Sequence, residues 1–157
     1  EDMINTVVRQ IAFYDFECKL HDARSKGELT PDDINAIWMS VQGESLGPAF
    51  EFMDGYETFW AYIPHFVHSP FYVYAYAFGD GLVNALFAVY KNNPVGFEDK
   101  YFEMLKAGGS MHHKDLLAPF GLDASDPKFW DQGLSMIASM IDKLEAIIWF
   151  LRQWVAK

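Results

Sequence analysis

The spacing of apolar residues along the chain predicts a protein built of helices. Apolar side chains recur every three or four positions through residues 2–26 and again after residue 126, as in helices with one apolar face. The two predicted faces are Ile4, Val7, Val8, Ile11, Tyr14 and Cys18, and Leu134, Ile137, Ile141, Leu144, Ile148, Leu151 and Val155. No stretch has a convincing strand pattern, so we expect an all-α bundle of six or seven helices.

Local signals predict where several of these helices begin and end. The run Thr30-Pro31-Asp32-Asp33 combines a capping hydroxyl, a proline in the first turn and acids near the positive end of the helix dipole. Ser125-Asp126-Pro127 is expected to open the last helix in the same way. Gly27 and Gly108-Gly109 are typical of helix ends, and Ser110 is expected to cap a further short helix.

The longest apolar run, residues 70–90, predicts a helix over residues 70–92 that is buried on all sides. The run approaches the length of a membrane span. Asp80 in its middle and the glycines Gly79 and Gly81 favour burial within the protein instead, with close helix packing at the two glycines.

Charge and composition exclude some classes of partner. The chain has 22 acidic against 12 basic residues and a net charge of −10, which argues against a nucleic acid partner. Cys18 is its one cysteine, so no internal disulfide can form, and the first ten residues lack the features of a signal peptide. We therefore expect a cytoplasmic protein that does not enter the membrane.

The candidate chemistry lies in residues 60–79, WAYIPHFVHSPFYVYAYAFG. We expect His65 in a loop, followed by a helix in which Tyr72 and Tyr76, four residues apart, share one face while Tyr74 points elsewhere. An imidazole and two phenols can offer several hydrogen-bond donors to one small oxygen-bearing target. The alternative is a buried aromatic stripe, which is the more common role of aromatic residues at helical spacing.

Metal-binding patterns are absent from the 157 residues. There is no H-E-x-x-H and no Cys/His ligand spacing. His65 and His68 flank a loop without a nearby carboxylate, and His112 and His113 are neighbours whose side chains should diverge on a helix. We expect His21 to be solvated and this chain to bind no metal.

Four stretches resemble the C-terminal part of the oligoendopeptidase F family, which belongs to the thimet-oligopeptidase-like zinc metallopeptidases. They are INTVVRQIAFYDFECKLHDAR, WAYIPHFVHSPFYVYAYAFG, KYFEMLKAGGS, and DPKFW with the closing helix. The resemblance implies a larger, mostly helical zincin-type endopeptidase that cleaves short peptides in a deep cleft. Residues 1–157 would be the C-terminal helical portion of its catalytic domain, with the zinc-binding H-E-x-x-H segment upstream.

The resemblance also implies roles for individual residues. His65 would hydrogen-bond the substrate backbone, and Tyr76 or Tyr72 would donate its phenolic proton to the oxyanion, an interaction worth on the order of 3 kcal/mol. Tyr74 could take the place of Tyr72. The chain alone is expected to be inactive, with apolar faces exposed where the upstream part would pack, which would allow self-association. The alternative is a non-catalytic helical interaction domain, in which these rings would be sealed in the core.

Overall fold

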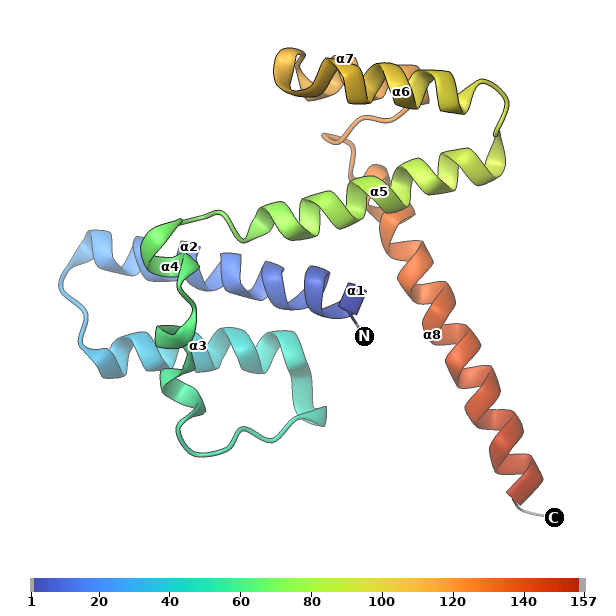
Figure 1. Cartoon of the computed structure of the whole chain (residues 1–157). Coiled ribbons are helices and arrows are strands. Elements are labelled where there is room, and N and C mark those ends of the chain that lie inside the picture. Colours follow the sequence, from blue (N-terminus) through green and yellow to red (C-terminus); the bar gives the residue numbers. More distant parts are fainter. Residues whose placement is uncertain (1, 156–157) are drawn as a thin grey trace. The chain divides into compact units, whose positions relative to one another are not determined.

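The computed structural model describes residues 2–155, with side chains through Arg152, as helices joined by turns, with no strand among them (Figure 1). The α-helices are α1 (Asp2–Ile4), α2 (Gln10–Lys26), α3 (Pro31–Leu46), α4 (His65–His68), α5 (Tyr74–Asn92), α6 (Phe97–Ala107), α7 (His113–Leu117) and α8 (Pro127–Val155). A π-helical segment, Asn5–Arg9, joins α1 to α2, and 3₁₀ turns lie at Gly47–Ala49, Tyr56–Tyr62, Gly108–Ser110 and Ala118–Phe120. The all-α prediction is confirmed, and the additional helices in the described residues are short ones such as α1 and α4.

The chain divides into two compact units, Glu1–Phe78 and Gly79–Lys157. In the first unit, Phe16 and Trp38 have no exposed surface, and their rings meet edge to face with centroids 5.2 Å apart. Phe66 of α4 joins this core, 5.1 Å from the ring of Phe16 and 5.6 Å from that of Phe13. The packing of α2 against α3 therefore also anchors the short helix that carries His65.

The predicted apolar face of the N-terminal helix is largely wrong. Val7 is buried, but Ile4, Val8, Ile11 and Tyr14 are 38–52% exposed. The buried face consists of Ala12, Phe13, Phe16 and Glu17. This helix is apolar on two faces, and the one with two phenylalanines packs on Trp38 because large aromatic rings bury more surface than aliphatic side chains.

The predicted start of α3 is confirmed in full. Asp33 donates its N–H to Thr30 Oγ1 at 3.3 Å, and the Thr30 N–H is donated to Asp33 Oδ2 at 2.8 Å, which completes a capping box. The Thr30 hydroxyl and N–H together hold the pKa of the Asp33 carboxyl below its usual value. Gly27 ends α2, as predicted, and donates its N–H to the Arg24 carbonyl at 3.3 Å.

The two later helix starts differ in which side chain caps them. At α8, the Lys128 N–H is donated to Asp126 Oδ1 at 3.0 Å, so the predicted start at Ser125-Asp126-Pro127 is confirmed with Asp126 as its cap, while the Ser125 hydroxyl donates to Asp123 Oδ1. At α7, the predicted cap Ser110 is wrong, because its hydroxyl donates to the Ala107 carbonyl at 2.7 Å. His112 caps this helix instead, with Nδ1 accepting the N–H of Lys114 at 3.3 Å.

The helix expected over residues 70–92 begins at Tyr74 and is not buried on all sides. In the second unit, Ala85 and Leu86 lie in a core with Leu117, Phe120, Leu122 and Phe129, while Val83 is 62% exposed. The expected close packing is found at Gly81 but not at Gly79. A Cβ placed on Gly133 of α8 would lie 3.1 Å from the Gly81 carbonyl oxygen, whereas one on Gly79 would meet nothing within 4 Å.

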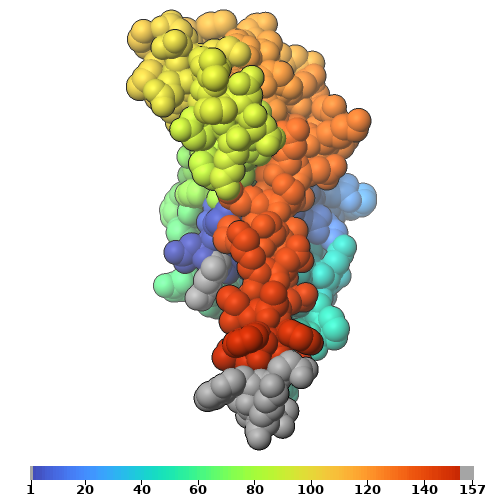
Figure 2. All heavy atoms as spheres, turned by 90° about the vertical axis from the view of Figure 1, so that its right-hand side faces the viewer, coloured from blue at the N-terminus to red at the C-terminus, as the bar shows by residue number. Residues whose placement is uncertain are grey.

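The apolar stripe of α8 lies at the surface. Figure 2 shows the side chains of this helix, orange to red, on the face toward the viewer. Leu134, Ile141, Leu144, Ile148 and Leu151 are each 40–56% exposed, Ile137 is half-buried, and the side chain of Val155 lies outside those described. Within residues 2–155, no helix combines the length and hydropathy that a membrane crossing requires.

Candidate functional site

Three of the predicted site residues meet in the first unit and form what we call the His65 cluster: His65, Tyr72 and Tyr76. His65 Nε2 lies 3.1 Å from the phenolic oxygen of Tyr76, within hydrogen-bond distance. The His65 and Tyr72 rings are parallel to within 4°, with centroids 6.3 Å apart. Tyr76 stands edge-on to both, 5.8 Å from His65 and 5.7 Å from Tyr72. An imidazole and two phenols therefore converge on one another.

His65 begins helix α4, whereas the sequence predicted that it lies in a loop. Pro64 precedes it with φ −66°, a value suited to a helix start, and the Pro64 carbonyl accepts the N–H of His68 at 2.9 Å. The loop prediction was wrong because Pro64 opens a single helical turn rather than only ending the preceding segment. His65 is thus fixed at the start of α4, next to Phe66, which packs in the core.

A tight turn links α4 to α5 and sets the place of Tyr72. The Tyr72 N–H is donated to the Ser69 carbonyl at 3.1 Å, Pro70 is the second residue of the turn, and Phe71 is the third with φ +60°. This is the pattern of a type II β-turn, whose third position normally favours glycine. Phe71 is the one non-glycine residue in the described chain with positive φ, a conformation that costs on the order of 1–3 kcal/mol.

Glu17 of α2 stabilises this turn from inside the unit. Its Oε1 accepts the Phe71 N–H at 2.8 Å, and its side chain has no exposed surface. Burial raises the pKa of the Glu17 carboxyl, against smaller opposing effects of the Phe71 N–H and of His21 and His65. Sequence reasoning missed both Glu17 and the turn, although Ser69-Pro70 was a turn signal and an acid among α2 core residues was unusual.

Tyr74 lies apart from the His65 cluster. Its ring packs edge-on against Tyr14 of α2, with centroids 5.7 Å apart. The expectation that Tyr74 points away from Tyr72 and Tyr76 is confirmed by these ring contacts.

The cluster is open to solvent. Tyr72 is 53% and Tyr76 40% exposed, and His65 is half-buried. The core residue of this stretch is Val73, which has no exposed surface. The alternative of a sealed aromatic stripe therefore does not describe Tyr72 and Tyr76.

The described residues do not fit a metal ion. No group of three or more His, Cys, Asp or Glu side chains among them could hold one. His112 and His113 do not diverge as expected: His112 is extended (φ −68°, ψ 143°), so their ring centroids lie 4.1 Å apart. The zinc implied by the family resemblance would need ligands from outside the described residues.

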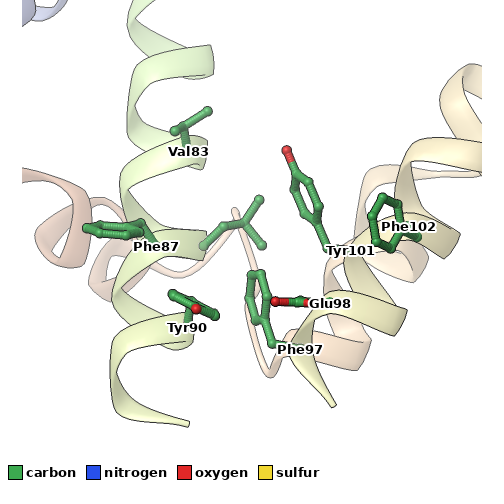
Figure 3. A pocket seen from close by; sticks show the side chains of 8 residues that line it. Val83, Phe87, Tyr90, Phe97, Glu98, Tyr101 and Phe102 are labelled. Atoms are coloured by element: carbon green, nitrogen blue, oxygen red, sulfur yellow. The ribbon is translucent and has the colours of Figure 1, made fainter. Parts of the chain in front are cut away.

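A separate pocket of about 510 Å³ lies within the second unit, between α5 and α6 (Figure 3). Phe87 and Tyr90 of α5 and Phe97 and Tyr101 of α6 line it, with Glu98 as its carboxylate. It contains none of the residues that the sequence predicted for a site.

Comparison with known proteins gives a consistent picture. The family model described as Peptidase family M3 matches residues 1–136. The chain is 30% identical over 144 residues to the plasmid oligoendopeptidase F of Lactococcus lactis subsp. cremoris, covering 91% of this chain and 24% of that protein. It is 29% identical over 154 residues to oligopeptidase PepF of Bacillus subtilis, covering 98% of this chain and 23% of that protein. No solved structure gives a significant match.

A homolog of oligoendopeptidase F in Borreliella burgdorferi is 29% identical over 148 residues, covering 94% of this chain and 25% of that protein. The chain thus spans about a quarter of the length of the curated relatives that it matches. The family match extends through the His65 cluster and over most of the chain. The chain therefore belongs to peptidase family M3.

Proposed function

We propose that this chain is the substrate-binding and oxyanion-stabilising part of a zinc metalloendopeptidase that hydrolyses short peptides. The observation that carries the proposal is the contact of His65 Nε2 with the Tyr76 phenol at 3.1 Å, on a surface where both tyrosines remain accessible. Membership of peptidase family M3 supports peptides as the substrate class.

The chemistry proposed for the cluster is hydrogen-bond donation to a peptide oxygen. If the His65 proton sits on Nε2, it is donated to the phenolic oxygen of Tyr76, and the Tyr76 O–H is left free for the substrate. A phenol that accepts a hydrogen bond is a stronger donor, because linked hydrogen bonds polarise one another. Tyr76 would then stabilise the negative charge that develops on the carbonyl oxygen, and Tyr72 would bind the neighbouring backbone.

Zinc, when bound, would polarise the scissile carbonyl and activate the attacking water. Its ligands would come from a part of the enzyme outside these 157 residues, so this chain alone would not hydrolyse peptides. The partners proposed here are accordingly short peptides and the zinc-binding part of the same enzyme.

The first prediction concerns Tyr76→Phe in a polypeptide that joins this chain to the zinc-binding part. Removing the phenolic oxygen should lower kcat about 100-fold or more, because one preorganised oxyanion donor is lost. Zinc content should stay unchanged, since Tyr76 is not a ligand in this proposal. Steady-state hydrolysis of a short fluorogenic peptide, with metal analysis of the same preparation, measures both quantities.

Tyr74→Phe is the matched control for this measurement. It removes the same atom two residues away, from a ring that packs on Tyr14 and does not contact His65. Its kcat should remain within a few-fold of the unsubstituted enzyme. Equal losses in the two variants, or no loss in Tyr76→Phe, would remove Tyr76 from the oxyanion role.

A helical interaction domain without catalysis is the second candidate function. The exposed apolar residues of α8 favour it, because surfaces of that kind commonly bind other proteins. The same enzyme assay separates the two candidates: peptide hydrolysis that depends on Tyr76 supports the peptidase, and its absence supports the interaction domain.

A further inference from the structure

We infer that Glu17 is a positioning residue for the His65 cluster: its buried carboxylate holds the turn at Phe71 and thereby fixes Tyr72 and Tyr76 against His65. This inference rests on the proposed function only for its catalytic consequence. The positioning itself stands on the geometry of the first unit.

The turn depends on a contact from a distant helix. In a type II turn the N–H of the third residue takes no part in the turn's own hydrogen bond, and here that N–H is donated to Glu17 Oε1 at 2.8 Å. Phe71 also has φ +60°, which the sequence of the turn does not favour. The contact from Glu17, 54 residues earlier, therefore compensates for a conformation that a phenylalanine rarely adopts.

One face of α2 holds the Phe71 side chain as well as its backbone. Tyr14, Glu17 and His21 are three and four residues apart, so they lie along the same side of the helix. The His21 ring lies 4.7 Å from that of Phe71, and the Tyr14 ring lies edge-on at 6.1 Å. Phe71 is thus fixed by ring contacts on both sides of its hydrogen bond to Glu17.

The turn lies directly between the members of the cluster. His65 starts the helix before it, Tyr72 is its last residue, and the Tyr72 carbonyl accepts the N–H of Ala75 in the first turn of α5 at 2.9 Å. A change of backbone direction at Phe71 would rotate Tyr72 and the start of α5 with it. The 3.1 Å distance from His65 Nε2 to Tyr76 therefore depends on a carboxylate whose hydrogen bond goes to the Phe71 N–H and to neither ring.

The test compares Glu17→Leu with Glu17→Gln in the 157-residue chain, by the ¹⁵N chemical shift of His65 Nε2. His65→Gln assigns the signal, and Tyr76→Phe gives its value without the phenol. Glu17→Leu has no acceptor for the Phe71 N–H, so its Nε2 signal should move toward that of Tyr76→Phe. Glu17→Gln keeps an amide oxygen of similar reach and should leave the signal near that of the unsubstituted chain.

A core variant separates positioning from loss of stability. Val41 is 2% exposed in the same unit, so Val41→Ala weakens the core without touching the turn. It should leave the His65 signal in place. The inference is overturned if Glu17→Leu leaves the signal unchanged, or if Val41→Ala moves it as far.

A double variant covers the outcome in which Glu17→Leu does not fold. Glycine adopts positive φ without help, so Phe71→Gly added to Glu17→Leu should restore both the fold and part of the His65 signal. Failure of the added glycine to restore either would count against the inference.

Catalysis provides the functional readout. In the polypeptide that includes the zinc-binding part, Glu17→Leu should lower kcat about 100-fold, as expected for a misplaced donor, and Glu17→Gln much less. If no form hydrolyses peptides, the proposed function fails, and the ¹⁵N comparison still decides the role of Glu17.

Discussion

Glu17 combines an ionisable group with complete burial, and this combination has energetic consequences of its own. Its Oε1 is satisfied by the Phe71 N–H, while Oε2 has no partner among the described residues. An ionised carboxylate with one unpartnered oxygen is costly away from water. Glu17 therefore lowers the stability of the folded chain while its hydrogen bond fixes the turn beside the His65 cluster.

The pH dependence of stability should reveal this cost. The pKa of Glu17 is raised on folding, chiefly by burial, so the folded state keeps a proton that the unfolded chain releases near pH 4.3. As pH rises from there through the folded pKa, the free energy of unfolding should fall by this group's contribution. Glu17→Gln has no such proton, so its free energy of unfolding should rise relative to the unsubstituted chain across this window and then level off.

Urea unfolding of both proteins at a series of pH values measures this difference. The titratable groups that interact with Glu17 include Tyr14 and His21 on its own helix and His65 on α4, and the positive forms of the two histidines favour the ionised carboxylate. Repeating the series with His21→Gln should therefore raise the folded pKa of Glu17 further and extend the upper end of the window to higher pH. A difference between the two proteins that is the same at every pH would contradict an elevated pKa.

At the residue scale the sequence predicted that Tyr72 and Tyr76 meet, but not how the chain brings them to His65. Tyr72 and Tyr76 touch, as their four-residue spacing indicated, although Tyr72 precedes the helix. Phe71 could not be predicted in a left-handed conformation, because local preferences oppose it in a phenylalanine. The group that stabilises it lies on a different helix, and a single sequence carries no signal for that contact.

Two helices of the second unit, α5 and α8, make a close backbone contact at Gly81 and Gly133. A Cβ on Gly133 would lie 3.1 Å from the Gly81 carbonyl oxygen and 3.3 Å from its Cα. These are backbone atoms within a helix and cannot move aside as a side chain could. Gly133→Ala should therefore lower the free energy of unfolding by roughly 1–3 kcal/mol, as is typical of overpacking, measured by thermal or urea unfolding.

Gly79→Ala provides the matched control within α5. Nothing lies within 4 Å of a Cβ at Gly79, so the gain in helix propensity should stabilise the protein by up to about 1 kcal/mol. Opposite signs for these two glycine-to-alanine changes are the expected result. Similar effects from both would show that the contact at Gly81 does not limit the packing of this unit.

Helix ends were easier to predict than helix faces, for a physical reason. The capping box of Thr30 and Asp33 is made by residues three apart, so the sequence contains all of its parts. The buried face of α2 is the one that packs on Trp38, and tertiary packing rather than local sequence determines which face that is. Likewise, His112 caps α7 because the backbone is extended there, and the nearby Ser110 offered an equally reasonable cap.

On the scale of the whole molecule, the apolar side chains exposed on α8 should lead to self-association. Leu144, Ile147, Ile148 and Phe150 are each at least 40% exposed, and burying such a surface against a second copy removes it from water. Static light scattering should show a mass that rises with protein concentration. Salt should increase the effect, because it screens the repulsion between chains of net charge −10.

Charged substitutions test whether α8 is responsible. Leu144→Glu combined with Ile148→Glu should keep the measured mass near that of a monomer at concentrations where the unsubstituted chain associates. Val95→Glu is the control, since Val95 is 84% exposed but lies between α5 and α6. A monomeric mass for the unsubstituted chain over a wide concentration range would contradict the prediction.

The burial of Trp38 makes the first unit visible to optical methods. Its indole has no exposed surface and donates Nε1–H to the Tyr56 carbonyl at 3.0 Å, whereas Trp149 in the second unit is 64% exposed. An aqueous quencher such as iodide reaches the second indole and not the first. The fluorescence that survives quenching therefore comes from Trp38 and from the half-buried Trp60 and Trp130, which pack against the first and the second core respectively, in the intact chain and without any label.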